Sequence, residues 1–315
     1  MNFLQLGYKG NNNVWWYVLT MFLVFVGINL ASIPLIIVAL ETVDFDMVKF
    51  QEAAETSFTT IGIDTNLYLF LMIFTFAFAI LVLFLCVKYM HKKKFLSIIT
   101  SRSKLDWKRI FFAFVLWGSV STVLILIGIF MSPEDYTWNF KLVPFTILLL
   151  VSFLFLPFQT SAEEFIFRGY LMQGFAILAK NKWFPLLMTS LIFGLLHGMN
   201  PEVDKLGPVV MVFYIGTGLL FGITTLMDEG TELALGLHAS NNIVAAFLVS
   251  TDWMVFQTDA LYLDTSEPTV GLEMFFSVLI LYPLLLVVFS KKYGWSNWEE
   301  KLFGVVEKPL LEETN

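Results

Sequence analysis

The chain has 315 residues, of which 57% are hydrophobic and only 14% are charged. A soluble globular domain has roughly a quarter of its residues charged, so this composition excludes an ordinary soluble protein. The formal net charge of -7 does not indicate nucleic-acid binding, and the single cysteine, Cys86, excludes an intramolecular disulfide.

The apolar residues form runs long enough to cross a hydrocarbon layer of about 30 Å. We therefore expect an all-α, multi-pass integral membrane protein with about eight transmembrane helices. In chain order the predicted helices are 14–40, 67–87, 110–131, 142–163, 183–198, 207–227, 231–250 and 270–290.

Charged residues in the connections predict the orientation of these helices. The connection over 88–109 is rich in Lys and Arg, whereas the connection over 41–66 is mainly acidic. Because basic loops tend to remain in the cytoplasm, residues 88–109 are predicted to lie inside. Alternation of the helices then places both termini in the cytoplasm.

Two pairs of glycines predict close contacts between helices. Gly194 and Gly198 have GxxxG spacing in the fifth predicted helix, and Gly218 and Gly222 have it in the sixth. Small residues at this spacing allow two membrane helices to approach closely.

Ionisable side chains inside a bilayer cost free energy, and where they persist they face the protein interior and have partners. The third histidine of the chain, His91, lies in the basic connection, and we expect it to be a solvated surface residue. The candidate site residues in or beside the predicted helices are Glu163, Glu164, Arg168, His197, His238, Asn241 and Asn242.

Helical spacing separates the two glutamates. Glu164 and Arg168 are four residues apart with the acid first, which favours a pair on one helix face. Glu163 is rotated from Glu164 by about 100°, so this pair does not require it. We therefore assign Glu164 and Arg168 a structural role and Glu163 a chemical one.

The histidines and the amide complete a set suited to amide hydrolysis. His238 and Asn242 are four residues apart and can point into one cavity, with Asn241 left to helix packing. Phe193 has the same spacing from His197 and can form an apolar wall beside the imidazole. A carboxylate and a histidine can activate water, while a second histidine and an amide can donate to an oxyanion.

Three motifs in order carry a resemblance to a known family. They are EEFIFR at 163–168, FGLLH at 193–197 and HASNN at 238–242. In these motifs the chain resembles the CAAX protease and bacteriocin-processing family, also called CPBP or Abi, of intramembrane peptidases. The resemblance covers roughly residues 142 to 250.

The resemblance implies a helical membrane bundle with an internal polar, water-filled cavity. Glu163 and His197 would position and deprotonate the attacking water, and His238 and Asn242 would form the oxyanion site. Glu164, Arg168 and Phe193 would support this arrangement. The implied substrate is a hydrophobic or lipid-tethered peptide or protein in the bilayer.

The family leaves the use of a metal open. Its members are commonly described as metallopeptidases, and a metal-free glutamate mechanism is also proposed for the CAAX type. Glu163, His197 and His238 could provide three ligands to a divalent metal such as zinc. Their spacing, however, is not a compact HExxH motif.

The resemblance also suggests a division of the chain. Residues 1–141 form an N-terminal membrane region with three predicted helices, and residues 142–250 form the peptidase core. Residues 251–315 comprise the last membrane helix and a cytoplasmic tail.

Functions of other classes could use the same residues. A proton-coupled transporter could use the glutamates and histidines as a relay, although no internal repeat is detectable. A non-catalytic scaffold or bacteriocin-immunity protein could keep the fold while losing a motif residue, yet this chain retains every one. The polar set could also serve only to lock helices together.

A helix over 142–163 places the glutamates too deep. Glu163 would reach the inner side after about 31 Å, whereas His197 would lie about 21 Å above that side. Pro157 could kink the helix. We instead expect the helix to continue through the apolar stretch 165–178, which raises Glu163 toward His197.

Overall fold

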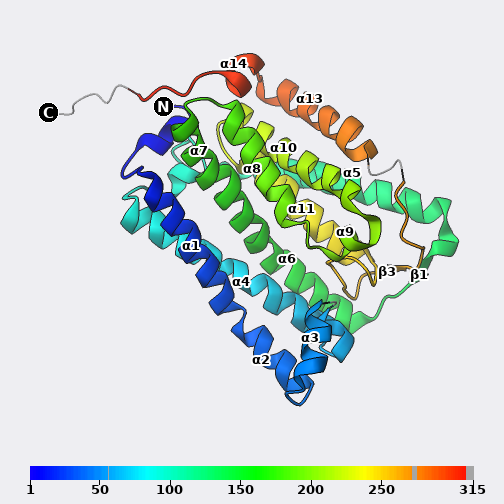
Figure 1. Cartoon of the computed structure of the whole chain (residues 1–315). Helices are drawn as coiled ribbons and strands as arrows, with labels where there is room; N and C mark the ends of the chain where they lie inside the picture. The colour runs from blue at the N-terminus through cyan, green and yellow to red at the C-terminus, as the bar shows by residue number, and fades with distance from the viewer. Residues whose placement is uncertain (56, 272–274, 310–315) are drawn as a thin grey trace.

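The structure is a computed structural model that describes residues 1–55, 57–271 and 275–309, and it is largely helical (Figure 1). The helices are α1 Val14–Ala31, α2 Ile33–Thr42, α3 Met47–Glu55, α4 Thr65–Leu85, α5 Trp107–Met131, α6 Leu142–Glu164, α7 Met172–Ala179, α8 Trp183–Leu196, α9 Pro201–Leu206, α10 Met211–Asp228, α11 Glu232–Leu248, α13 Tyr282–Tyr293 and α14 Trp298–Phe303. Three π-helical segments extend neighbouring helices, namely η3 Cys86–Met90, η6 Phe165–Leu171 and η8 Ser277–Leu281.

Within the described residues, five helical segments are long and apolar enough to cross a membrane. They are Val14–Thr42, Thr65–Met90, Trp107–Met131, Leu142–Ala179 and Pro208–Asp228. The other three predicted spans correspond to α8, α11, and η8 with α13, each of 17 residues or fewer. Residues 272–274 of the last one lie outside the described part. The all-α membrane class is therefore confirmed, while the count of eight stays a prediction.

The fourth predicted helix is much longer than 142–163. Segments α6, η6 and α7 form one apolar helix of 38 residues, Leu142–Ala179, which is about 57 Å long. The expected continuation beyond the glutamates is thus confirmed, and the predicted end at residue 163 was wrong. Glu163 and Glu164 lie in the interior of this helix, directly before its π-helical turn.

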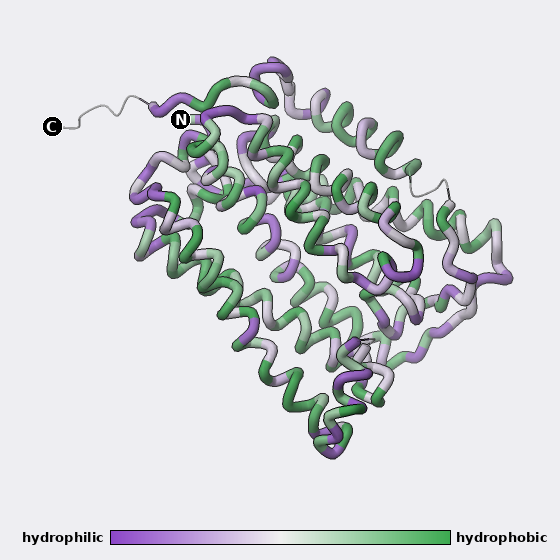
Figure 2. The backbone as a smooth tube through the Cα atoms, viewed as in Figure 1, coloured by the Kyte–Doolittle hydropathy of each residue, from purple (hydrophilic) through white to green (hydrophobic). Residues whose placement is uncertain are grey.

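Apolar side chains cover the outside of the bundle, and α11 lies inside it. Figure 2 shows hydrophobic residues along α1, α2 and α4. Large side chains such as Phe25 and Phe130 are more than half exposed, as expected for contact with lipid. Helix α11 packs against α5, α6 and α10, and most of its residues are buried.

Glycines allow the helices around the centre to approach closely. A methyl group at Gly218 of α10 would lie 2.9 Å from the carbonyl oxygen of Ser190 in α8, and one at Gly194 would lie 2.5 Å from Ile215. The interpretation as helix-contact positions is confirmed for these two glycines and for Gly222, whose methyl group would lie 2.5 Å from Leu186, but it was wrong for Gly198, which lies beyond the end of α8 and approaches only its own turn closely. In the same way, a methyl group at Gly236 of α11 would lie 2.2 Å from the carbonyl oxygen of Ile110 in α5.

A small sheet closes one end of the bundle. Strand β3 (Tyr262–Asp264) pairs antiparallel with β1 (Tyr136–Trp138) and parallel with β2 (Val249–Ser250). The sheet holds the connections that follow α5 and α11 at this end. The sequence analysis predicted no strand, because the short segments lie in connections between apolar runs.

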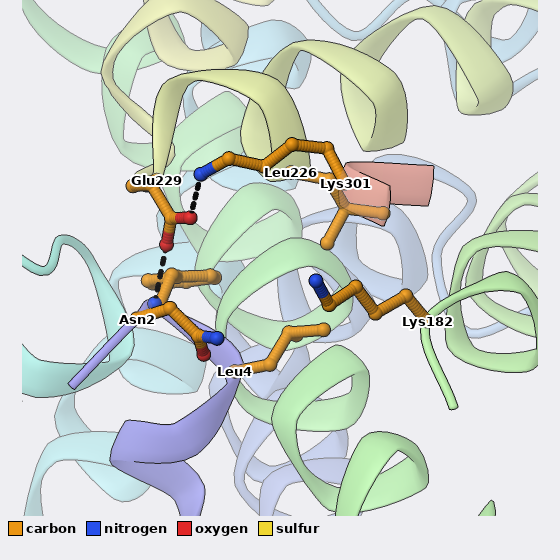
Figure 3. A pocket seen from close by; sticks show the side chains of 7 residues that line it. Asn2, Leu4, Lys182, Leu226, Glu229 and Lys301 are labelled. Carbon is orange, nitrogen blue, oxygen red and sulfur yellow. Dashed lines mark hydrogen bonds and ion pairs between the residues drawn. The ribbon is translucent and has the colours of Figure 1, made fainter. Parts of the chain in front are cut away.

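Both terminal segments meet at the opposite end, where Figure 3 shows the side chains around Glu229. The amide of Phe3 donates to Glu229 Oε2 at 2.5 Å, and Lys301 near the C-terminus pairs with the same carboxylate. The space between them is about 10 Å³, roughly the size that one water needs. Since Ser101 of the basic connection also bonds Glu229, both terminal segments lie on the side of that connection. That this side faces the cytoplasm stays a prediction.

The expectation that His91 is solvated was wrong, because the N-terminal segment packs over its fully buried side chain. Its Nδ1 lies 2.6 Å from the carbonyl oxygen of Asn11, and its Nε2 lies 2.6 Å from the Tyr170 hydroxyl. Burial lowers the pKa of His91. Its charged sequence neighbours gave no sign of this packing.

The contact between α5 and α11 can be tested by two matched substitutions. Gly236→Ala should lower the thermal midpoint, because overpacking of about 1–3 kcal/mol exceeds the gain in helix propensity of about 1 kcal/mol. Gly118→Ala in α5 is the control, since its methyl group would lie at an ordinary 3.5 Å from Ser240 Cβ. Equal midpoints for the two variants would contradict the packing argument.

Candidate active site

Two neighbouring glutamates of α6 face one histidine of α11. His238 Nδ1 lies 2.8 Å from Glu164 Oε1, and His238 Nε2 lies 3.6 Å from Glu163 Oε2. All three side chains are buried. The structure therefore brings together the first and third sequence motifs, with one imidazole between two carboxylates.

Glu164 also binds the guanidinium of Arg168. Arg168 Nη1 lies 3.2 Å from Glu164 Oε1, and Nη2 donates to the carbonyl oxygen of Gly218 at 3.2 Å. Both charged side chains are fully buried. The guanidinium carbon lies 4.3 Å from the ring centre of Phe193 and 5.2 Å from that of Phe221, so cation–π contacts replace part of its hydration.

Gln159 is a site residue that the sequence analysis missed. Its amide donates to Glu163 Oε1 at 2.5 Å and accepts from Asn242 Nδ2 at 2.9 Å. The amide group thus joins the carboxylate of α6 to the asparagine of α11. The signal was a polar residue four positions before Glu163 in an apolar run, which is the spacing of one helix face.

Asn241 and Asn242 have different partners on α11. Asn241 accepts from Trp117 Nε1 of α5 at 3.2 Å and donates to Asn242 Oδ1 at 3.2 Å. Asn242 alone reaches Gln159 and hence Glu163. This geometry agrees with the different roles that helical spacing predicts for the two residues, with Asn242 in the site and Asn241 in helix packing.

His197 contacts the ring of Phe193, which in turn contacts His238. Its ring centre lies 4.6 Å from that of Phe193, whose ring is 5.8 Å from His238. Its Nδ1 lies 2.7 Å from the Phe193 carbonyl oxygen. Among the described residues, no hydrogen bond joins His197 directly to Glu163, so the two residues expected to share a water are not in direct contact.

The hydrogen-bond partner of Nδ1 in each imidazole determines the position of the proton and the direction in which Nε2 points. A carbonyl oxygen only accepts, so His197 Nδ1 must carry the proton, and a neutral ring then exposes the lone pair of Nε2. Glu164 likewise holds the proton on His238 Nδ1 and turns Nε2 toward Glu163. Glu163 Oε2 is buried and has no hydrogen-bond partner among the described residues, so it remains available to accept from a water or a substrate.

The three residues considered for a metal do not form a compact ligand set. Among the described residues, no group of three or more His, Cys, Asp or Glu side chains is arranged to hold a metal ion. Glu163 and His238 face each other, and the Nδ1 bond of His197 to a carbonyl oxygen leaves its Nε2 free.

Comparison with known proteins gives two matches. Residues 142–244 match the family model described as type II CAAX prenyl endopeptidase Rce1-like. Over 244 residues the chain is 31% identical to "Uncharacterized protein YyaK" of Bacillus subtilis (strain 168), which covers 77% of this chain and 80% of that protein. No solved structure gives a significant match.

The family model spans α6 to α11 and includes all three motifs, EEFIFR, FGLLH and HASNN. The relative extends the similarity well beyond this segment, to about three quarters of the chain. The motifs, the buried contacts among them and both matches agree. The chain belongs to the Rce1-like type II CAAX prenyl endopeptidase family, the CPBP or Abi family of membrane proteins.

Proposed function

We propose that the chain is an intramembrane endopeptidase that cleaves a hydrophobic or membrane-tethered peptide by attack of an activated water. The observation that carries the proposal is the buried Glu163 Oε2, which has no hydrogen-bond partner among the described residues and lies 3.6 Å from His238 Nε2. This oxygen can therefore accept a hydrogen bond from a water held between the two side chains.

Glu163 acts as the general base. The attacking water donates one proton to Glu163 Oε2 while its oxygen bonds to the scissile carbonyl carbon. His197 accepts a hydrogen bond from the same water at Nε2, which is the nitrogen left free by its bond to Phe193. Glu163 then gives the proton to the leaving amine as the carbon–nitrogen bond breaks, so the carboxylate is regenerated.

His238 and Asn242 stabilise the oxyanion of the tetrahedral intermediate. An imidazolium at His238 donates from Nε2 while Glu164 accepts from Nδ1. Asn242 uses one amide N–H to hold Gln159, and its second N–H remains for the substrate oxygen. One such donor contributes about 3–4 kcal/mol to a transition state in known enzymes.

Charge balance supports a protonated His238. Ionised Glu163, Glu164 and Arg168 together carry a charge of -1, and all three side chains are buried. One proton on His238 makes the cluster neutral, which lowers the cost of burying it. The same proton supplies the Nε2 donor that the oxyanion requires.

The location of the site selects the substrate. Glu163 lies in the interior of the 38-residue helix, and the large side chains around the bundle are apolar. A peptide reaches this depth most easily when its ends are hydrophobic or carry a lipid. A lipidated, CAAX-like peptide is the substrate class that the family description suggests.

Turnover of a lipidated CAAX-like peptide in detergent tests the roles of the base and the histidine. Glu163→Gln should lower kcat by about 10²–10⁴-fold, because the amide keeps the bond to Gln159 but cannot accept the proton. His197→Ala should also lower kcat. Glu134→Gln, an exposed substitution outside the site, should leave turnover unchanged. Wild-type turnover in either site variant would overturn the role assigned to that residue, and no turnover by the wild type would favour a scaffold.

The different structural roles of the two glutamates can be tested by stability. Glu164→Ala leaves the buried Arg168 without its carboxylate, and breaking a buried pair from one side costs about 3–5 kcal/mol. Glu163→Ala leaves that pair intact. The thermal midpoint should therefore fall further in Glu164→Ala than in Glu163→Ala, and equal midpoints would contradict the separation of roles.

A further inference from the structure

A further buried carboxylate, outside the three motifs, lies close to His197 in the chain. Glu202 of α9 is only 3% exposed, and its Oε1 accepts from the hydroxyl of Tyr214 in α10. The side chain of Asn200 donates both to Glu202 Oε1 at 3.1 Å and to the Tyr214 oxygen at 3.0 Å. Glu202 Oε2 accepts from the backbone amide of Val255 at 3.1 Å. The carboxylate thus joins α9, α10 and the connection before β3.

The ring that this carboxylate holds is stacked on the imidazole of His197. The two ring centres are 4.4 Å apart and the planes differ by 24°. His197 follows the last residue of α8, so its backbone has left the regular helix. Its orientation therefore depends on three contacts of its ring, which are the Nδ1 bond to the Phe193 carbonyl oxygen, the tilted contact with the Phe193 ring and the stack on Tyr214.

The Nδ1 bond and the Tyr214 stack restrict different movements of the imidazole. The bond to the Phe193 carbonyl fixes which nitrogen carries the proton, but the ring can still rotate about the line of that bond. The Tyr214 ring restricts this rotation because a tilted imidazole would lose the stacked surface. Glu202 in turn restricts Tyr214, since the phenol gives up a buried hydrogen bond if the ring moves.

We propose that Glu202 and Tyr214 form a positioning pair that fixes the orientation of the His197 imidazole, and hence of its Nε2, in the site. Neither residue touches the reacting atoms, so both act through His197. The orientation of the ring does not depend on the reaction, whereas its effect on turnover rests on the proposed peptidase function. The proposal gives the buried Glu202 carboxylate, which accepts from three donors, a role in orienting His197 in addition to joining the helices.

The ring orientation can be measured without activity. The chain has only three histidines, so ¹⁵N-histidine-labelled protein in detergent gives three imidazole signal sets, and the His197→Ala variant identifies the one of His197. Tyr214→Phe and Tyr214→Leu should shift or broaden the His197 signals and leave those of the distant His91 unchanged. Unchanged His197 signals in both variants would overturn the proposal.

Tyr282→Phe is the matched control. Tyr282 is buried and shares a 2.8 Å hydrogen bond with Thr217 of α10, so this variant also removes a buried phenol contact to the same helix. Its ring contacts Trp117 and Phe213 rather than His197. The His197 signals should match the wild type in this control, and an equal shift there would mean that any loosening of α10 suffices.

The effect on turnover distinguishes positioning from general stability. Tyr214→Leu should lower kcat by about ten- to a hundredfold with little change in KM, the scale of a displaced catalytic group. Glu202→Gln keeps an acceptor for the phenol and should retain more activity than Glu202→Ala. In a His197→Ala background, Tyr214→Leu should cause no further loss, whereas an additive loss would overturn the proposal.

The two proposals fail in different ways. If the wild type does not cleave the peptide but its His197 signals respond to Tyr214, the peptidase function fails and the positioning pair stands. If cleavage depends on Glu163 while neither the signals nor kcat respond to Tyr214, the positioning pair fails alone.

Discussion

The structure depends on one buried charge network, in which Glu164 binds both Arg168 and His238. A single charge at this position would cost several kcal/mol, so each member requires the others. Because Glu164 and Arg168 lie on the long helix and His238 lies on α11, the network fixes how these helices meet. The same contacts orient the imidazole that faces Glu163. Helix packing and the orientation of His238 therefore depend on the same three side chains.

The packing around the network follows from this requirement. Arg168 needs a place without water, and the rings of Phe193 and Phe221 with the Gly218 carbonyl provide it. Gly218 can present that carbonyl because α8 and α10 pack closely beside it. A π-helical turn, Phe165–Leu171, begins directly after Glu164 and contains Arg168. Such turns are frequent at functional sites because they change the direction of successive side chains.

Phe193 contacts two polar groups of the site. Its ring contacts Arg168 and His238, which both bind Glu164. Its ring also contacts His197, which is stacked on Tyr214. Under the proposed mechanism, Glu163 is the base and His238 is the oxyanion donor. His197 is then the further group that contacts the attacking water.

The sequence by itself determined the membrane class, the motifs and their sorting by helical spacing. Apolar runs of about 20 residues favour membrane helices, and Glu164 and Arg168 meet because residues four apart share a helix face. It also predicted that the fourth helix continues past the glutamates. It could not predict the contacts of Gln159, the burial of His91 or the stack of Tyr214 on His197. These depend on residues from different helices, and their pairing is decided by how helices cross, which local spacing does not encode. Only the tertiary structure placed His238, rather than His197, against Glu163, because the depth of each histidine is determined by where its own helix begins and which neighbours it packs against.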